Sequence, residues 1–352
     1  MIGRLFTGFS AGAYCFVIPI YVGEISSNEI RGGLLSSFQV ILNIGVTTVY
    51  TIGYLFNLHT LNIVCAIIPI IYTLIFMFLP ESPEFLVRKG KHEAAEQSMM
   101  LLRCKAFDYK SEINELIKQQ QEMSQKYPAT FLELSQKPAI RKAFFIIMTQ
   151  FFFFQMSGIN AVLFYMTTIF IDADIQLEPA LATIIVGCVQ VIGSLLSTFL
   201  VDKIGRKILL ILSTTLMTFS LIGIGVYFTL KQADVNVDAI RWLSVVSLSV
   251  FVMSFSSGMG PMSYVLLGEL FLFAPDAKSK IAPMGQVLNF LLSFMIGMIF
   301  PILVETIGSG STFFIFSGFT TLALLFSILI VPETKGKSLV EIQSELTKSS
   351  ID

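Results

Sequence analysis

The chain has 352 residues, of which 54% are hydrophobic and only 13% are charged. With a mean hydropathy of +0.78, this composition excludes a water-soluble globular domain and predicts a protein that crosses the membrane several times. The net charge of −1 excludes the clustered positive charge that nucleic-acid binding needs. We therefore expect the lipid bilayer, and no nucleic acid, as a partner.

The chain offers little material for catalysis or metal binding. Its two histidines, His59 and His92, lie far apart, and its four cysteines occur singly. A free thiol in an apolar stretch behaves as a small hydrophobe, and the apolar stretches carry no nucleophile paired with a base and no phosphate-binding loop. We predict no enzyme activity, no metal and no cofactor.

Nine apolar stretches are long enough to cross a hydrocarbon core, which takes about 20 residues each. They lie at 5–23, 33–56, 61–79, 143–171, 179–201, 208–230, 242–268, 281–304 and 312–331. The predicted fold class is an all-α membrane protein.

Residues 81–142 interrupt this series with a charged stretch that contains Pro83, Pro128 and Pro138. Its segments 92–103 and 108–126 have helical composition and spacing. We interpret the stretch as a cytoplasmic linker whose short amphipathic helices pack beneath the bundle. A catalytic or partner-binding role is the alternative.

The basic residues predict the orientation, because cytoplasmic loops of membrane proteins retain Lys and Arg. If the linker is cytoplasmic and the spans alternate, only Arg4, Lys231 and Arg241 of the 23 basic residues fall on the opposite side. This distribution places the C-terminus in the cytoplasm and Met1 on the other side of the membrane.

Two blocks of the chain repeat. GEI at 23–25 corresponds to GEL at 268–270, and each block closes two spans later with Pro-Glu, at 80–81 and at 332–333. Spans one to three therefore repeat as spans seven to nine, whereas spans four to six have no counterpart upstream. A duplicated architecture predicts three further spans before Met1, so we expect a truncated form of a twelve-span protein. Its expected parts are a truncated N-terminal bundle (1–80), the linker (81–142), a C-terminal six-span bundle (143–332) and a cytoplasmic tail (333–352).

Seven motifs follow one another in a specific order: GR at 3–4, PIYVGEIS at 19–26, PESP at 80–83, QMSGIN at 155–160, DKIGRK at 202–207, GELF at 268–271 and PETKG at 332–336. In this order and spacing the chain resembles the sugar-porter family of the major facilitator superfamily. Within it, the stretch from Gln155 to Phe170 is similar to the insect facilitated trehalose and hexose transporters. The resemblance implies the major facilitator fold, with nine of its usual twelve helices.

The resemblance also implies a function, the facilitated transport of a sugar by alternating access. Sugar hydroxyls both donate and accept hydrogen bonds, and each Gln or Asn amide matches them with one acceptor and two donors. By match to the family's motif positions, the expected sugar contacts are Gln39, Gln155, Asn160, Gln190, Tyr264 and Asn289. Hydrogen bonding between helices is the alternative role for each amide alone.

Gln155 and Asn160 present a geometric problem, because five residues of regular helix separate two side chains by about 140°. Either the helix loosens at Ser157-Gly158, or the cavity is wide and the two amides flank it. Gly258, Gly260 and Pro261 mark a second span that can break, where an irregular helix should face protein or water.

Charged residues at the ends of the spans suggest a cytoplasmic latch. The family uses such residues as salt bridges between its two halves, and the matching positions are Glu24, Arg31, Glu81, Asp202, Arg206, Glu269 and Glu333. Pairs of this kind can form and break as a two-state element. Ordinary topology marking and helix capping are the alternatives.

The sequence departs from the family pattern at several positions. Phe154 occupies the place of a second Gln, Tyr264 that of a Trp, Ser256 that of a Glu or Gln, and Glu84 that of an Arg. These departures leave open which sugar is carried. No charged residue lies in the middle of a span, which favours a uniporter over proton coupling. A non-transporting protein that senses sugar or binds partners remains the alternative function.

Overall fold

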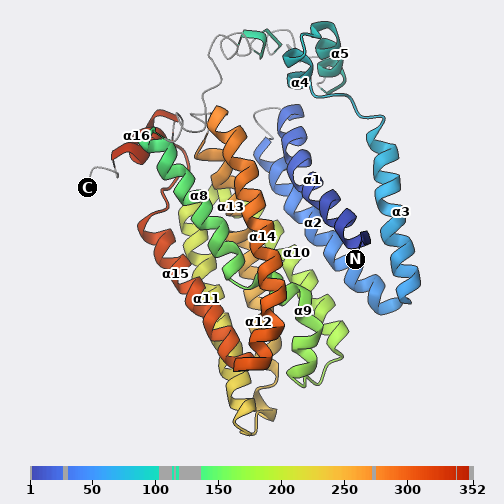
Figure 1. The fold of residues 1–352 in the computed structure, drawn as a ribbon, viewed down its shortest axis with the longest axis vertical. Coiled ribbons are helices and arrows are strands. Elements are labelled where there is room, and N and C mark those ends of the chain that lie inside the picture. Colours follow the sequence, from blue (N-terminus) through green and yellow to red (C-terminus); the bar gives the residue numbers. More distant parts are fainter. Residues whose placement is uncertain are drawn as a thin grey trace. The chain divides into compact units, whose positions relative to one another are not determined.

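The computed structural model describes residues 2–26, 31–102, 113–114, 116–118, 136–271, 275–337 and 339–348. All regular secondary structure in these residues is helical, as Figure 1 shows. This finding confirms the predicted all-α class. A helix satisfies its own backbone hydrogen bonds, which lipid cannot do, so it is the expected form of these apolar segments.

In the described chain, nine segments are long and apolar enough to cross a membrane, as predicted. Seven are single helices, namely α1 (Ile2–Ile25), α2 (Arg31–Leu55), α3 (Leu58–Phe76), α10 (Pro179–Ile204), α11 (Arg206–Gln232), α14 (Pro275–Ile307) and α15 (Ser309–Leu329). The other two are interrupted. One consists of α8 (Pro138–Met156) and α9 (Ile159–Asp172), the other of η1 (Asp238–Ile240), α12 (Trp242–Ser254), η2 (Phe255–Met259) and α13 (Gly260–Glu269).

By its packing, the chain divides into two compact units. The first consists of Met1–Phe38 with Phe56–Ala129, and the second of Gln39–Leu55 with Thr130–Asp352. The C-terminal part of α2 therefore packs with the second unit. The four-part division expected from the repeat stays a prediction.

The linker helices α4 (Pro83–Arg88) and α5 (His92–Leu102) belong to the first unit. Pro83 opens α4, where its missing N–H is no loss, and Ser82 caps the helix by accepting a hydrogen bond from Phe85 N over 3.3 Å. Leu86 and Val87 pack against the buried Ala95 of α5.

Helix α5 confirms the helix expected at 92–103. Of the second linker helix, expected at 108–126, residues 113–114 and 116–118 are helical and the others lie outside the described residues. Leu116 and Ile117 pack on the α4–α5 cluster, a contact that the sequence did not predict.

The core of the second unit is built from aromatic and aliphatic side chains of α8 to α15. Phe151, Phe251, Phe313 and Phe316 are all at most 2% exposed. Large apolar side chains such as Phe219 point outward and are exposed. Apolar side chains on the outer surface are expected where the solvent is lipid and not water.

The span formed by α8 and α9 breaks at Ser157-Gly158, as predicted. Gly158 has φ = +81°, in the left-handed region, where residues with a Cβ are strained. A Cβ at this position would also lie 2.6 Å from Cδ2 of Phe316. Ser157 Oγ donates to the carbonyl of Phe154 over 2.7 Å, so the side chain satisfies one of the backbone groups that the break frees.

The second interrupted span contains the π-helical turn η2, at the place where the glycines predicted a break. A π turn leaves backbone groups without their usual hydrogen-bond partners. Ser213 of α11 takes the place of these partners. Its Oγ donates to the carbonyl of Ser254 over 2.7 Å and accepts from Met259 N over 2.9 Å. Gly258 permits this approach, because a Cβ there would lie 2.9 Å from the carbonyl oxygen of Leu209.

The substitution Gly158→Ala tests the left-handed turn. We expect it to destabilise the protein by about 2 kcal/mol, because the new Cβ is strained at positive φ and collides with Phe316. Thermal unfolding in detergent measures the effect. The matched control is Gly318→Ala in α15, where an added Cβ meets no atom within 4 Å. Equal midpoints for the two variants would contradict the role of the turn.

Candidate functional site

Four polar side chains of α8, α9 and α14 form what we call the amide network. Gln155 Nε2 donates to Asn289 Oδ1 over 2.6 Å. Asn160 Nδ2 donates to Gln155 Oε1 over 2.8 Å and to Ser293 Oγ over 2.7 Å. Gln155 and Asn289 are buried, at 1% and 4% exposure. A buried amide without partners is costly, so this network satisfies groups that lipid could not.

The break at Gly158 brings Gln155 and Asn160 together. On a regular helix these two side chains would point about 140° apart, but the left-handed turn redirects α9 so that the two amides hydrogen bond directly. The first of the two geometric alternatives, a loosened helix, therefore holds. Ser293, one turn after Asn289 on α14, is a member of the network that the sequence did not single out.

Aromatic rings lie beside the network. Tyr264 Oη is 3.4 Å from Nδ2 of Asn289, which donates to it. Phe154 packs edge-on against Phe255, with ring centroids 4.8 Å apart, and also contacts Tyr264. The ring that replaces a second amide at position 154 thus joins an aromatic group next to the polar side chains. Such a surface suits the apolar face of a ring-shaped ligand.

Gln39 and Gln190, the remaining two expected contacts, belong to a second amide group. Both donate from Nε2 to Oδ1 of Asn43, each over 3.2 Å. Asn43 and Gln190 are buried, at 0% and 3% exposure. Asn43 is not among the residues that the family motifs indicated, although its position one helical turn after Gln39 on the same face of α2 was a usable signal.

Three of the expected latch residues, Arg206, Glu269 and Glu333, meet at one end of the second unit. The Arg206 guanidinium pairs with Glu269, with 3.0 Å between Nη2 and Oε1. Thr334 Oγ1 donates to the other oxygen of Glu269. Arg206 and Glu269 both lie in the expected C-terminal bundle, so the pair joins α11 to the end of α13. Salt bridges between two halves stay a prediction.

Glu333 caps the N-terminus of α11. Its carboxylate accepts hydrogen bonds from the backbone N–H groups of Arg206, Lys207, Thr334 and Lys335, at 2.9 to 3.0 Å. Partial burial acts to raise the pKa of Glu333, but these four donors outweigh it, and the pKa lies below its ordinary value. Gly205, at φ = +104°, makes room, because a Cβ there would lie 2.7 Å from Oε2 of Glu333.

The latch residues of the first unit have different partners. Glu24 pairs with Arg88 of α4, at 2.7 Å between Oε1 and Nη2, a partner that no sequence motif indicated. The main-chain carbonyl of Glu81 accepts from Ser98 Oγ over 2.5 Å. The side chains of Arg31 and Asp202 lie outside the described residues.

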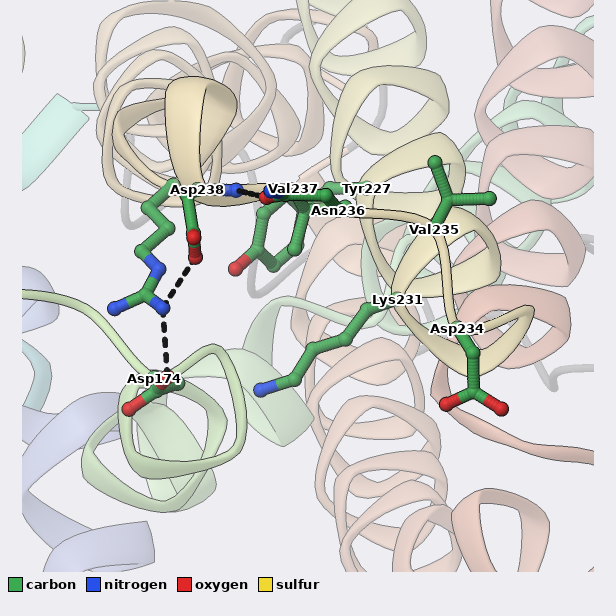
Figure 2. A pocket seen from close by; sticks show the side chains of 9 residues that line it. Asp174, Tyr227, Lys231, Asp234, Val235, Asn236, Val237 and Asp238 are labelled. Carbon is green, nitrogen blue, oxygen red and sulfur yellow. Dashed lines mark hydrogen bonds and ion pairs between the residues drawn. The ribbon is translucent and has the colours of Figure 1, made fainter.

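A separate polar pocket of about 310 Å³ lies where the α9–α10 turn meets the loop between α11 and η1. Arg241 pairs with Asp174 over 3.3 Å and with Asp238 over 2.5 Å, and so joins the two loops. Figure 2 shows the Lys231 side chain reaching toward the Asp174 turn, while Asp234 points away. Lys231 Nζ donates to the carbonyl of Asp172 over 2.6 Å. These contacts connect the two loops, and none of them involves a residue of either amide group.

Comparison with known proteins extends over nearly the whole chain. A family model described as sugar (and other) transporter matches residues 1–346. The facilitated trehalose transporter Tret1 of Apis mellifera ligustica is 34% identical over 344 residues, which are 97% of this chain and 68% of that protein. Tret1 of Aedes aegypti is 32% identical over 346 residues, but the chain spans only 43% of its length.

Among solved structures, the chain is similar to the major facilitator superfamily proton:xylose symporter XylE bound to 6-bromo-6-deoxy-D-glucose. The TM-score is 0.69 at 25% identity, over 93% of this chain and 70% of that one. This likeness confirms the expected major facilitator fold.

Glu333→Gln tests the cap of α11. Because the pKa of Glu333 is lowered by folding, its stabilisation is fully present above the unfolded pKa of about 4.3 and is lost as the pH falls through the lower folded-state pKa. At pH 7 we expect the variant to be less stable by about 1 kcal/mol, the usual contribution of a helix cap. The difference should shrink below about pH 4. Thermal unfolding in detergent across this range measures it, with Glu305→Gln, at an exposed carboxylate, as the control. A difference that is independent of pH would contradict the charged cap.

Proposed function

The chain belongs to the sugar (and other) transporter family, and from this premise we propose that it carries a sugar, trehalose or a hexose, across the membrane by alternating access. The observation that carries the proposal is the amide network, in which the break at Gly158 gathers Gln155, Asn160 and Asn289 from three helices. The network provides the donors and acceptors that sugar hydroxyls require.

The contacts inside the network are of the kind that a sugar can replace. Gln155 bonds Asn289 and Asn160 with neutral amide groups, and a hydroxyl can substitute for either partner in each bond. Exchanging one neutral hydrogen bond for another changes the free energy little. The net free energy of sugar binding at such a site is therefore small. The site does not hold the sugar too tightly to release it on the other side of the membrane, as facilitated transport requires. The nearby rings of Tyr264 and Phe154 cover an apolar sugar face.

The proposal includes the plasma membrane as the location and a cytoplasmic C-terminus. The concentration of basic residues on the side of the linker and the tail supports this orientation. On this view the Arg206–Glu269 pair and the Glu333 cap lie at the cytoplasmic end of the bundle and belong to the latch. An epitope tag after Asp352 should bind antibody only in permeabilised cells. Labelling of intact cells would contradict the orientation.

Uniport is the proposed mode of transport. Among the described spans, Asp, Glu, Lys and Arg occur only near the ends, and a proton relay needs an ionisable group within the membrane. The alternative is a membrane protein that binds sugar, or a partner, without transporting it.

Uptake of radiolabelled glucose and trehalose into oocytes or transporter-deficient cells tests the proposal. We expect saturable uptake, and we expect Gln155→Ala and Asn160→Ala each to raise KM by about fivefold to tenfold, because each removes hydrogen bonds to the sugar. Surface biotinylation checks expression, and Asn62→Ala, at an exposed position of α3, is the matched control.

Two results would count against it. An unchanged KM in both variants would remove these residues from the site. Surface-expressed protein that shows no saturable uptake would contradict transport, and retained sugar binding in that protein would indicate the sensing alternative.

A further inference from the structure

The second amide group is incompletely paired. Asn43 Oδ1 accepts two hydrogen bonds, from Gln39 and Gln190, but Asn43 Nδ2 is buried without a partner among the described residues. Gln190 Oε1 is likewise buried and unpaired. Native proteins rarely leave such atoms unsatisfied, so each one requires an explanation.

The count of unpaired atoms does not depend on how the amides are turned. Turning all three by 180° keeps both hydrogen bonds with donor and acceptor exchanged, and again leaves one donor and one acceptor free on Asn43 and Gln190. Turning only one amide would set donor against donor or acceptor against acceptor. One unpaired donor and one unpaired acceptor therefore remain on two adjacent side chains.

The backbone holds these two side chains close together. Gly187 of α10, three residues before Gln190, lies against Thr47 of α2, four residues after Asn43, and a Cβ at Gly187 would lie 2.9 Å from Thr47 Oγ1. Thr47 Oγ1 donates to the carbonyl of Asn43 over 2.9 Å, so it is already engaged. Two further bonds join the C-terminal part of α2 to the same unit, from Tyr50 Oη to Leu163 O and from Tyr54 Oη to Glu178.

We propose that Asn43 and Gln190 form a subsite for one sugar hydroxyl, with Asn43 as a specificity-determining residue, and this rests on the proposed function. The hydroxyl accepts from Asn43 Nδ2 and donates to Gln190 Oε1. A hydroxyl does both, whereas a carboxylate only accepts and an ammonium only donates. A water molecule has the same chemistry, and the experiment separates the two sources.

The probe is tritiated glucose, displaced from the purified full chain by glucose or by its single-deoxy analogues. Two variants address the subsite. Asn43→Asp keeps the oxygen that accepts from Gln39 and Gln190 and replaces only the free donor, while Asn43→Leu removes both groups at similar volume. Asn62→Leu, at an exposed position of α3, is the matched control.

We expect one deoxy analogue to bind the unmodified chain about threefold to tenfold more weakly than glucose, the factor for one net hydrogen bond. Both Asn43 variants should lose this discrimination for that analogue alone, while Asn62→Leu retains it. If Asn43→Leu does not fold, Asn43→Asp still gives the pattern.

Two results would overturn the subsite while leaving the proposed function standing. Variants that keep the full discrimination would show that water, and not the sugar, occupies the position. Variants that bind all the sugars equally more weakly would show that Asn43 only supports the packing. Failure of the unmodified chain to bind both tritiated glucose and tritiated trehalose would instead refute the proposed function, on which the subsite rests. Binding without uptake would leave the subsite intact and refute transport alone.

Discussion

The left-handed turn at Gly158 determines where the side chains of the amide network meet. A membrane span can break only where protein groups satisfy the backbone that the break exposes. Here Ser157 bonds the carbonyl of Phe154, and Phe316 packs so closely that only glycine fits. The reoriented α9 then places Asn160 on Gln155. The left-handed backbone at Gly158, the packing of Phe316 and the hydrogen bonds of the amide network therefore depend on one another.

The same constraint explains the second broken span. The π turn at η2 frees the carbonyl of Ser254 and the N–H of Met259, and Ser213 Oγ of α11 donates to the first and accepts from the second. The turn also brings Phe255 against Phe154. Both irregular segments are thus stabilised by neighbouring helices, and both place side chains beside the amide network. Irregular helices that face protein are typical of spans with a binding role.

The two amide groups differ in a way that matters for binding. In the amide network, Gln155 bonds partners through both its nitrogen and its oxygen. In the second group, Asn43 and Gln190 each keep one atom without a partner in the described part of the chain. A ligand must displace existing bonds in the first group but only completes bonds in the second. The second group can therefore contribute to selectivity with little competition from the protein.

The sequence by itself determined the helical class, the nine spans, the family and the two places where spans break. The length of each apolar stretch, the order of the motifs and the positions of the glycines can all be read along the sequence without knowing which helices are neighbours. Which polar side chains pair was decided only by the tertiary structure. Asn43 joins Gln39 to Gln190 across 147 residues, Glu24 pairs with Arg88, and Glu333 caps α11 from 127 residues away. Such partners depend on how helices cross and rotate, and because a span's lipid-facing and buried sides are both apolar, its sequence alone does not reveal which side faces a neighbour.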